Sequence, residues 1–499
     1  MLKEPVNFSL SALTIATLAA VSAIHAEMVL KWSDEFEYAG APDPGKWTHE
    51  IGGGGWGNQE LQTYTDSLEN SRVEDGKLII EVQQVLGNRS PQYTSARLIS
   101  REKGQWKYGR VEVRAKVPSE TGTWAAVWML PADTLWSTTF WPDNGEIDIL
   151  EHVGYEEDPL FKALKNDPQL PNLHSTLHTE KNNGWSGGGI GGSAYWPDAS
   201  TAFHTYALNW TEEGMTFEVD GVVHFSIDRP TFREPPPDPW QYWPFDQRFF
   251  LVLNVAIGGG WGGHFNSTYY PNDSPYGFSG IDHDGVWPQR MEIEYIRVYG
   301  TDEPPMATSA PGTLLPTDMD DDTGVLIELS QNPESSHSLK NIDAGDRMDF
   351  VVTAPIAGGY SVSTSAAAPD GGSTVTIEAL ESGSSSSPKA VPATGGWQAW
   401  QPLDLGTVQL QQGTNTLRIS TETGGFNLAA LTVELETATN WKGWTPDLSG
   451  NVDTQSWLGE VNITHAPWIY LYSPGKYAYM PSATIPESLP EDAWIYFPR

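Results

Sequence analysis

Cysteine is absent from this chain of 499 residues, so no disulfide bond stabilises its fold. Basic residues are few: 28 lysines and arginines stand against 64 aspartates and glutamates, which gives a formal net charge of -36. A charge of this sign and size argues against nucleic acid and against an anionic lipid surface as partners. It also disfavours sulfated polysaccharides, so a neutral polymer fits the chain better.

Long apolar runs are also absent after residue 26, and no later stretch is suited to span a membrane. Before it, Lys3 is followed by an apolar run at residues 10–23 and by small residues up to Ala26. This order is typical of a secretory signal peptide at residues 1–26, whereas a membrane anchor needs a longer run. We therefore expect a monomeric bacterial protein that is secreted or held at the cell surface, extracellular or periplasmic.

Helical periodicity is missing between residues 31 and 299, where short alternating runs are separated by glycine, proline, asparagine and aspartate. Examples of these runs are residues 77–82, 109–115 and 217–224. Many short strands of this kind predict a sandwich or a barrel. We predict an all-β chain whose first domain covers residues 27–300.

An apolar, strand-like stretch at residues 144–153 contains three carboxylates, Glu146, Asp148 and Glu151. In a regular strand Glu146 and Asp148 share one face, and Glu151 points to the other. One extra residue at positions 149–150 would bring Glu151 to the same face, and such β-bulges are frequent beside active sites. The sequence therefore predicts a bulge here.

Three carboxylates on one face suit the hydrolysis of a glycosidic bond, which uses one carboxylate as nucleophile and one carboxylic acid as proton donor. Asp148 would influence the proton affinity of its neighbours, because like charges disfavour joint ionisation. From spacing alone, a calcium-binding or solvated acidic strand is an equal alternative.

The stretch resembles the active-site signature of glycoside hydrolase family 16, in its bulged form and closest to the laminarinase (endo-1,3-β-glucanase) branch. Further blocks resemble that family in its order, at residues 32–36, 52–62, 108–116, 124–131, 253–258 and 295–299. The resemblance covers roughly residues 29–300. It implies a β-jelly-roll sandwich with one concave face as the cleft, Glu146 as nucleophile, Glu151 as acid/base and Asp148 tuning both.

The resemblance also implies contacts to substrate outside the acidic stretch. Asn58, Arg97 and His178 match positions that hydrogen-bond sugar hydroxyls or the catalytic carboxylates. Tryptophans suit the apolar faces of sugar rings, and the candidates here are Trp124, Trp128 and Trp261, with Trp56 in a glycine-rich loop. Taken alone, each tryptophan is more often a core residue, and His178 is more often a buried, hydrogen-bonded histidine.

Catalysis of this kind needs no cofactor, but the family often has a structural calcium held partly by an aspartate of the final strand. Glu294 stands at the matching position here. Because calcium accepts glutamate oxygens, the resemblance implies a calcium ligand at Glu294.

Three further segments come after the first domain. Residues 301–323 are rich in proline and aspartate and predict a flexible linker, which implies a first domain independent of the rest. Residues 324–437 contain more short strands and resemble a carbohydrate-binding module of family 6, at residues 357–362, 394–400 and 425–428. Residues 438–499 are rich in tryptophan and tyrosine, and we expect a small β module without assigned chemistry.

In the family 6 resemblance, an aromatic residue and an asparagine grip a sugar, which points to Trp397 or Trp400 and to Asn427. A core tryptophan and a capping asparagine are an equal alternative. Because Trp397 and Trp400 are three positions apart, we expect them to point to opposite faces, with Trp397 as the sugar platform.

The sequence thus predicts a secreted, endo-acting, retaining hydrolase of β-1,3 linkages in laminarin-like or mixed-linkage glucans. Two alternatives stay open. One is a family member that acts on another polysaccharide, such as agar. The other is a non-catalytic glucan-binding protein, against which the intact Glu146, Asp148 and Glu151 count.

Overall fold

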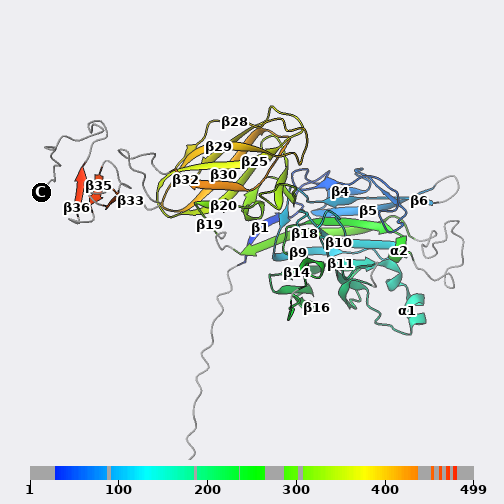
Figure 1. Ribbon diagram of the computed structural model, residues 1–499. Helices are drawn as coiled ribbons and strands as arrows, with labels where there is room; N and C mark the ends of the chain where they lie inside the picture. The colour runs from blue at the N-terminus through cyan, green and yellow to red at the C-terminus, as the bar shows by residue number, and fades with distance from the viewer. Residues whose placement is uncertain are drawn as a thin grey trace, which may run out of the picture.

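The computed structural model describes residues 28–86, 91–184, 188–234, 236–263, 286–301 and 307–436, with four short strands further on. Two units of paired sheets, residues 28–301 and residues 307–436, lie side by side (Figure 1). The prediction of an all-β chain is confirmed. The predicted signal peptide lies outside the described residues.

The first unit contains a sheet of ten strands. Its order is β16 (Val222–Asp228), β15 (Gly214–Val219), β14 (His204–Trp210), β9 (Gly109–Lys116), β18 (Gln289–Thr301), β5 (Lys77–Leu86), β6 (Pro91–Ser95) and β3 (Gln62–Tyr64), with β1 (Met28–Asp34) beside β18 and β4 (Ser71–Glu74) beside β5. Side chains alternate between core and surface along β9, as expected of a sheet with one buried face.

A second sheet of eight strands completes the first unit. Its order is β13 (Ile190–Ala194), β12 (Leu173–His178), β11 (Glu146–Val153), β10 (Thr123–Pro131), β17 (Phe249–Ile257), β7 (Arg97–Ile99) and β2 (Thr48–His49), with β8 (Gln105–Trp106) beside β17. One continuous apolar core lies between the two sheets, with Val113, Val127 and Leu253 among its buried residues. The unit is the predicted jelly-roll sandwich.

Helical segments in the described residues are short. They are η1 (Gly154–Glu157), α1 (Pro159–Lys165), η2 (Pro239–Gln241), α2 (Gly259–Gly262) and η3 (Pro316–Asp318). None of these helices has the length and apolar character that crossing a membrane requires.

The second unit is a smaller sandwich of two seven-stranded sheets. One sheet contains β19 (Thr308–Ser309), β24 (Arg347–Ala354), β30 (Gly413–Thr423), β26 (Thr374–Ala379) and β27 (Ser384–Ser385), with β21 (Asp321–Asp322) and β28 (Lys389–Ala390). The other contains β20 (Gly312–Leu314), β32 (Leu431–Leu435), β25 (Gly358–Ala367), β31 (Phe426–Leu428), β23 (His337–Ile342) and β22 (Leu326–Leu329), with β29 (Gln401–Leu410). They enclose a separate core that includes Phe350 and Leu417.

The prediction of a linker at residues 301–323 is wrong from about residue 307 onwards. Strands β19, β20 and β21 pair with β24 and β32 inside the second unit. Ala310 and Leu314 are buried in that unit's core. The second sandwich therefore begins near residue 307, because these short strands find partners far away in the sequence.

A separate sheet of four strands lies in the C-terminal segment. It consists of β33 (Asn451–Asp453), β34 (Glu460–Asn462), β35 (Trp468–Leu471) and β36 (Lys476–Tyr479). These antiparallel strands are the part of the segment that the structure describes, and they agree with the expected small β module.

Candidate active site

Strand β11 presents three carboxylates on one face because it contains a bulge. Leu150 and Asp148 oppose consecutive residues of β10, so Ile149 is the extra residue. Ile149 and Leu150 both enter the core, and the alternation starts again after them. The predicted bulge is confirmed, and it directs three side chains into one cleft: Glu146, Asp148 and Glu151.

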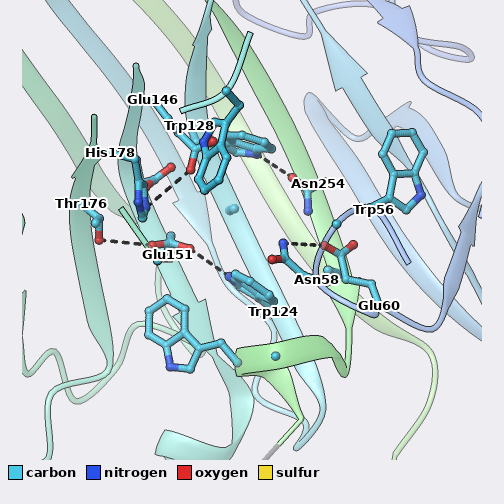
Figure 2. Close-up of a pocket in the computed structure, with 18 of the residues that line it drawn as sticks. Trp56, Asn58, Glu60, Trp124, Trp128, Glu146, Glu151, Thr176, His178 and Asn254 are labelled. Carbon is cyan, nitrogen blue, oxygen red and sulfur yellow. Dashed lines mark hydrogen bonds and ion pairs between the residues drawn. The ribbon is translucent and has the colours of Figure 1, made fainter. Parts of the chain in front are cut away.

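This cleft has a volume of about 920 Å³ and lies over the eight-stranded sheet (Figure 2). The carboxylates lie on its floor, and aromatic and polar side chains from four further strands, two loops and the short helix α2 surround them. The structure brings together all seven residues for which the sequence predicted contact with substrate: Trp56, Asn58, Arg97, Trp124, Trp128, His178 and Trp261.

His178 lies beside two of the carboxylates. It is the last residue of β12, directly opposite Glu146 in the sheet. Its Nε2 atom is 3.2 Å from Asp148 Oδ2 and 3.6 Å from Glu146 Oε1. The imidazole at this place lowers the pKa of Glu146, against the larger effects of burial and of the Asp148 charge, which raise it.

Glu151 is held by neutral donors instead. The indole Nε1 of Trp124 donates a hydrogen bond of 3.1 Å to Glu151 Oε1, and the Thr176 hydroxyl donates one of 3.4 Å to Oε2 (Figure 2). These bonds orient the Glu151 carboxyl without placing a full positive charge against it.

Burial changes the proton affinity of all three carboxyls. Desolvation, reinforced by the charge of Asp148, raises the pKa of Glu146 and of Glu151 from 4.5 to about 8. Desolvation also raises the pKa of Asp148 well above its ordinary value. Because like charges this close cannot all ionise together, the cluster keeps a proton at neutral pH.

Stacked side chains form the wall beside the carboxylates. The guanidinium of Arg97 lies 4.9 Å from the ring centre of Trp56 and 4.8 Å from that of Trp128. The Trp128 indole donates a hydrogen bond of 2.7 Å to Asn254 Oδ1, and Asn254 donates one of 3.0 Å to the Tyr64 hydroxyl. This network fixes ring orientations, which a sugar-binding wall requires.

A second aromatic group lies near Glu151. The rings of Trp124 and Trp261 meet edge to face at 5.7 Å, and Trp261, from α2, also contacts the His174 ring at 4.8 Å. Asn58 lies on the opposite rim, where its amide donates a hydrogen bond of 3.2 Å to Glu60 (Figure 2).

Sequence reasoning missed several residues that line the cleft, including Phe140, Trp141, Thr176 and Asn254. Asn254 had a usable signal, because it is the one polar residue of the otherwise apolar β17. Thr176 could have been found by alternation from His178. Phe140 and Trp141 lie in a connection without periodicity, so no local pattern marks them.

Comparison with known proteins agrees with this geometry. The family model described as "Glycosyl hydrolases family 16" matches residues 58–261. A "Beta-glucanase" of Rhodothermus marinus is 44% identical over 276 residues, which are 55% of this chain and 85% of that relative. The chain belongs to glycosyl hydrolase family 16. Its first unit, residues 28–301, is the family 16 domain.

Further matches cover the same domain and the one after it. A "Glucan endo-1,3-beta-glucosidase" of Cryptopygus antarcticus is 32% identical over 305 residues, 58% of this chain and 98% of that relative. The X-ray structure of the laminarinase from Rhodothermus marinus is 42% identical, covers 56% of this chain and 100% of that one, and has a TM-score of 0.48. The model "Carbohydrate binding module (family 6)" matches residues 317–435, so the second unit, residues 307–436, is a family 6 module.

The family 6 module contains a pocket of its own, with a volume of about 590 Å³. Trp397 lines it with 51% of its surface exposed, while Trp400 is half-buried and lies outside the pocket lining. Asn427 is 2% exposed and donates hydrogen bonds of 3.2 Å to Glu328 Oε1 and 3.0 Å to the carbonyl of Trp397. Trp397 and Asn427 thus meet in this pocket, and Trp400 does not join them.

The expected calcium ligand does not fit its place in the family 16 domain. The Glu294 carboxylate forms an ion pair of 2.7 Å with Arg114. In the part of the chain that the structure describes, the one cluster with metal-ligand geometry is Glu146, Asp148 and His178, whose ligand atoms lie within 4.8 Å of one another. The prediction of a calcium ligand at Glu294 is therefore corrected: an arginine already neutralises this carboxylate.

Proposed function

We propose that this family 16 enzyme is a secreted, endo-acting β-glucan hydrolase that cleaves β-1,3 linkages in laminarin-like or mixed-linkage glucans with retention. The observation that carries the proposal is the bulged strand β11, which places Glu146, Asp148 and Glu151 together in a cleft with aromatic walls. The relatives named as β-glucanase and endo-1,3-β-glucosidase support the choice of substrate.

In the proposed reaction Glu151 is the general acid and Glu146 the nucleophile. Glu151 donates its proton to the glycosidic oxygen while Glu146 attacks the anomeric carbon, which yields a covalent glycosyl-enzyme and a free sugar end. A water molecule, deprotonated by Glu151, then releases the sugar from Glu146. The neutral donors on Glu151 and the proximity of His178 to Glu146 support this division of roles.

Asp148 and His178 support the nucleophile in this proposal. Asp148 lies between the two glutamates and raises the pKa of both, so that their protonation states depend on each other. His178 contacts Glu146 and Asp148 and stabilises the charge that Glu146 carries before attack and regains after release. No cofactor is needed for either step.

Two further parts of the proposal concern the localisation of the enzyme and its attachment to the substrate. The order of residues 1–26, a basic residue followed by an apolar run and small residues, supports secretion. The exposed Trp397 and the buried Asn427 support glucan binding by the family 6 module, which would raise the local concentration of enzyme on insoluble substrate.

Reducing-sugar release from laminarin, a mixed-linkage β-glucan and agarose tests the substrate. We expect release from the first two and none from agarose. Release from agarose alone would favour a galactan hydrolase, and glucan binding without any release would favour a non-catalytic binding protein.

Proton NMR of the first products tests retention. A nucleophilic glutamate predicts that the β anomer appears first and converts to the α anomer by mutarotation. An α anomer formed first would mean direct attack by water and would overturn the role of Glu146.

A further inference from the structure

The family 6 module packs onto the cleft sheet of the family 16 domain. Leu326, at the start of β22, is fully buried in a cluster with apolar residues of that sheet: Ile99, Leu130, Phe250 and Val252. On the same three strands, Ile99, Leu130 and Val252 lie two positions and Phe250 lies four positions from the cleft residues Arg97, Trp128 and Asn254, and they therefore share the face of these residues. The module thus covers one margin of the face that carries the active site.

Main-chain hydrogen bonds join the two units at the same place. The amide of Thr134 donates to the Ile327 carbonyl at 2.9 Å, and the amide of Leu329 donates to the Thr134 carbonyl at 3.2 Å. The amide of Ile327 donates to Asp133 Oδ1 at 2.8 Å. Hydrogen bonds therefore join strand β22 of the module to the segment that comes after β10.

A shared arginine strengthens this contact. Arg248 of the family 16 domain binds Asp133 through Nε at 2.9 Å and Nη2 at 2.7 Å. The same guanidinium pairs with Asp322 and donates a hydrogen bond of 3.0 Å to the Val325 carbonyl, both in the module. Asp133 is 1% exposed, so separating the units would leave desolvated charges without partners, which is strongly unfavourable.

The segment at residues 132–145 connects this interface with the cleft. Leu135 is buried in the module's core, with Trp136 packed beside it. At the other end, two residues before Glu146, Asn144 accepts a hydrogen bond from the Trp136 amide at 3.1 Å and donates to the Ser137 and Thr139 carbonyls. Between these anchors the segment presents two aromatic residues to the cleft: Phe140 and Trp141.

These aromatic residues belong both to the cleft and to the interface between the two units. Phe140 and Trp141, together with Trp128, pack against the apolar cluster that contains Leu326. The Trp141 ring also lies 6.0 Å from the ring of His178. A displacement of the module would therefore remove the support behind this wall of the cleft.

We infer that the family 6 module is a fixed structural part of the catalytic unit, which holds Phe140 and Trp141 in place beside Glu146 and so determines substrate binding at this side of the cleft. The interface contradicts the expectation that the first domain is independent of the C-terminal part of the chain. This role of the module goes beyond the proposed glucan hydrolysis and does not depend on what its own pocket binds.

Full-length variants test the inference. Asp322→Asn removes the charge that Arg248 meets across the interface, whereas Asp321→Asn, its neighbour on β21, changes an exposed aspartate that pairs with Arg347 inside the module. Leu326→Ala removes the buried interface side chain, and Leu417→Ala removes a buried leucine from the module's own core. Each variant thus has a control of the same chemistry away from the interface.

Amide hydrogen exchange is the first measurement. We expect faster exchange at residues 132–145 in Asp322→Asn and Leu326→Ala, and parental exchange there in Asp321→Asn and Leu417→Ala, even though Leu417→Ala lowers the melting temperature. Parental exchange in both interface variants, or equal acceleration in Leu417→Ala, would overturn the inference. Exchange does not require turnover, so this result is independent of whether the chain hydrolyses laminarin.

Kinetics on a short laminari-oligosaccharide is the second measurement. We expect KM to rise roughly three- to tenfold in Leu326→Ala, the range of one lost aromatic contact, with a smaller change in kcat. An unchanged KM together with faster exchange would show that the module orders the segment without setting substrate binding, and would overturn that part of the inference.

Discussion

The cleft of the family 16 domain and the pocket of the family 6 module use similar residues for different purposes. Both contain tryptophan, asparagine and glutamate. In the pocket, Glu328 forms an ion pair of 3.2 Å with Lys340 and accepts hydrogen bonds from the amides of Gln398 and Asn427. In the cleft, three carboxyls are buried together and burial raises their pKa values.

This difference distinguishes a site suited to catalysis, the cleft, from a site suited to recognition, the pocket. A carboxylate that lysine and amides already bind is suited to orienting other groups, because these contacts fix its position. Carboxyls crowded in an apolar cleft keep a proton that they can donate, and the charge of one controls the protonation of the next. Substitutions in the two sites and changes of pH can test this comparison, and the largest effect is expected at Glu146 and Glu151.

Glu146→Gln and Glu151→Gln should each lower kcat at least about 10²-fold, because the proposed reaction needs the charge of Glu146 and the proton of Glu151. Both changes are nearly isosteric, so melting temperatures should stay close to that of the parent. The control is Glu81→Gln, another buried glutamate, which pairs with Arg72 and Arg290 on the opposite sheet. Turnover near the parental value in either cleft variant would contradict the assigned roles.

Burial raises the pKa of both Glu146 and Glu151 to about 8, so the two should titrate as a pair, and activity should fall on the alkaline side once the pair has lost the proton that Glu151 donates. Once this proton is lost the general acid is deprotonated, and kcat/KM should fall about tenfold per pH unit. Because the pKa values of Glu146 and Glu151 are higher in the folded chain than their ordinary 4.5, stability should also fall as pH rises from 4.5 to 8. Undiminished activity at pH 10 would disagree with a buried acid.

Trp397→Ala should weaken glucan binding by the family 6 module by about 1–3 kcal/mol, as for other stacking aromatics, with little change in melting temperature. Trp397 is exposed, so its removal leaves no cavity. Trp400→Ala is the matched control: it should lower the melting temperature, and binding only as far as folding is lost. Isothermal titration with a β-glucan oligosaccharide, together with melting curves, measures both. If Trp397→Ala left binding intact, Trp397 would not be the sugar platform of this pocket.

Glu294→Gln is expected to have the smallest effect, about 0–1 kcal/mol on the free energy of unfolding, because its ion pair with Arg114 is partly exposed. A chelator should leave the melting temperature of the parent unchanged. If a chelator clearly lowered the melting temperature and added calcium reversed this drop, the prediction of a calcium ligand, against which the structure argues, would be supported again.

The linker and calcium predictions failed for one reason: the residues that contact each other lie far apart along the chain. The linker prediction failed because β20 and β21 are two or three residues long and pair with strands near residues 431 and 348. The calcium prediction failed because sheet register places Arg114 beside Glu294. Neither partner is visible in the local pattern, since a pattern reports which face a residue occupies and not which residue lies opposite.

The sequence by itself determined the all-β class, the bulge on β11 and the carboxylates that this bulge gathers, because strand alternation is a local property with a period of two residues. Only the tertiary structure decided how the two units meet. The contacts of Leu326 with the cleft sheet and of Arg248 with Asp322 join residues more than 70 positions apart. Such contacts arise from the packing of complementary surfaces, so the support behind Phe140 and Trp141 became visible only once both sandwiches were in place.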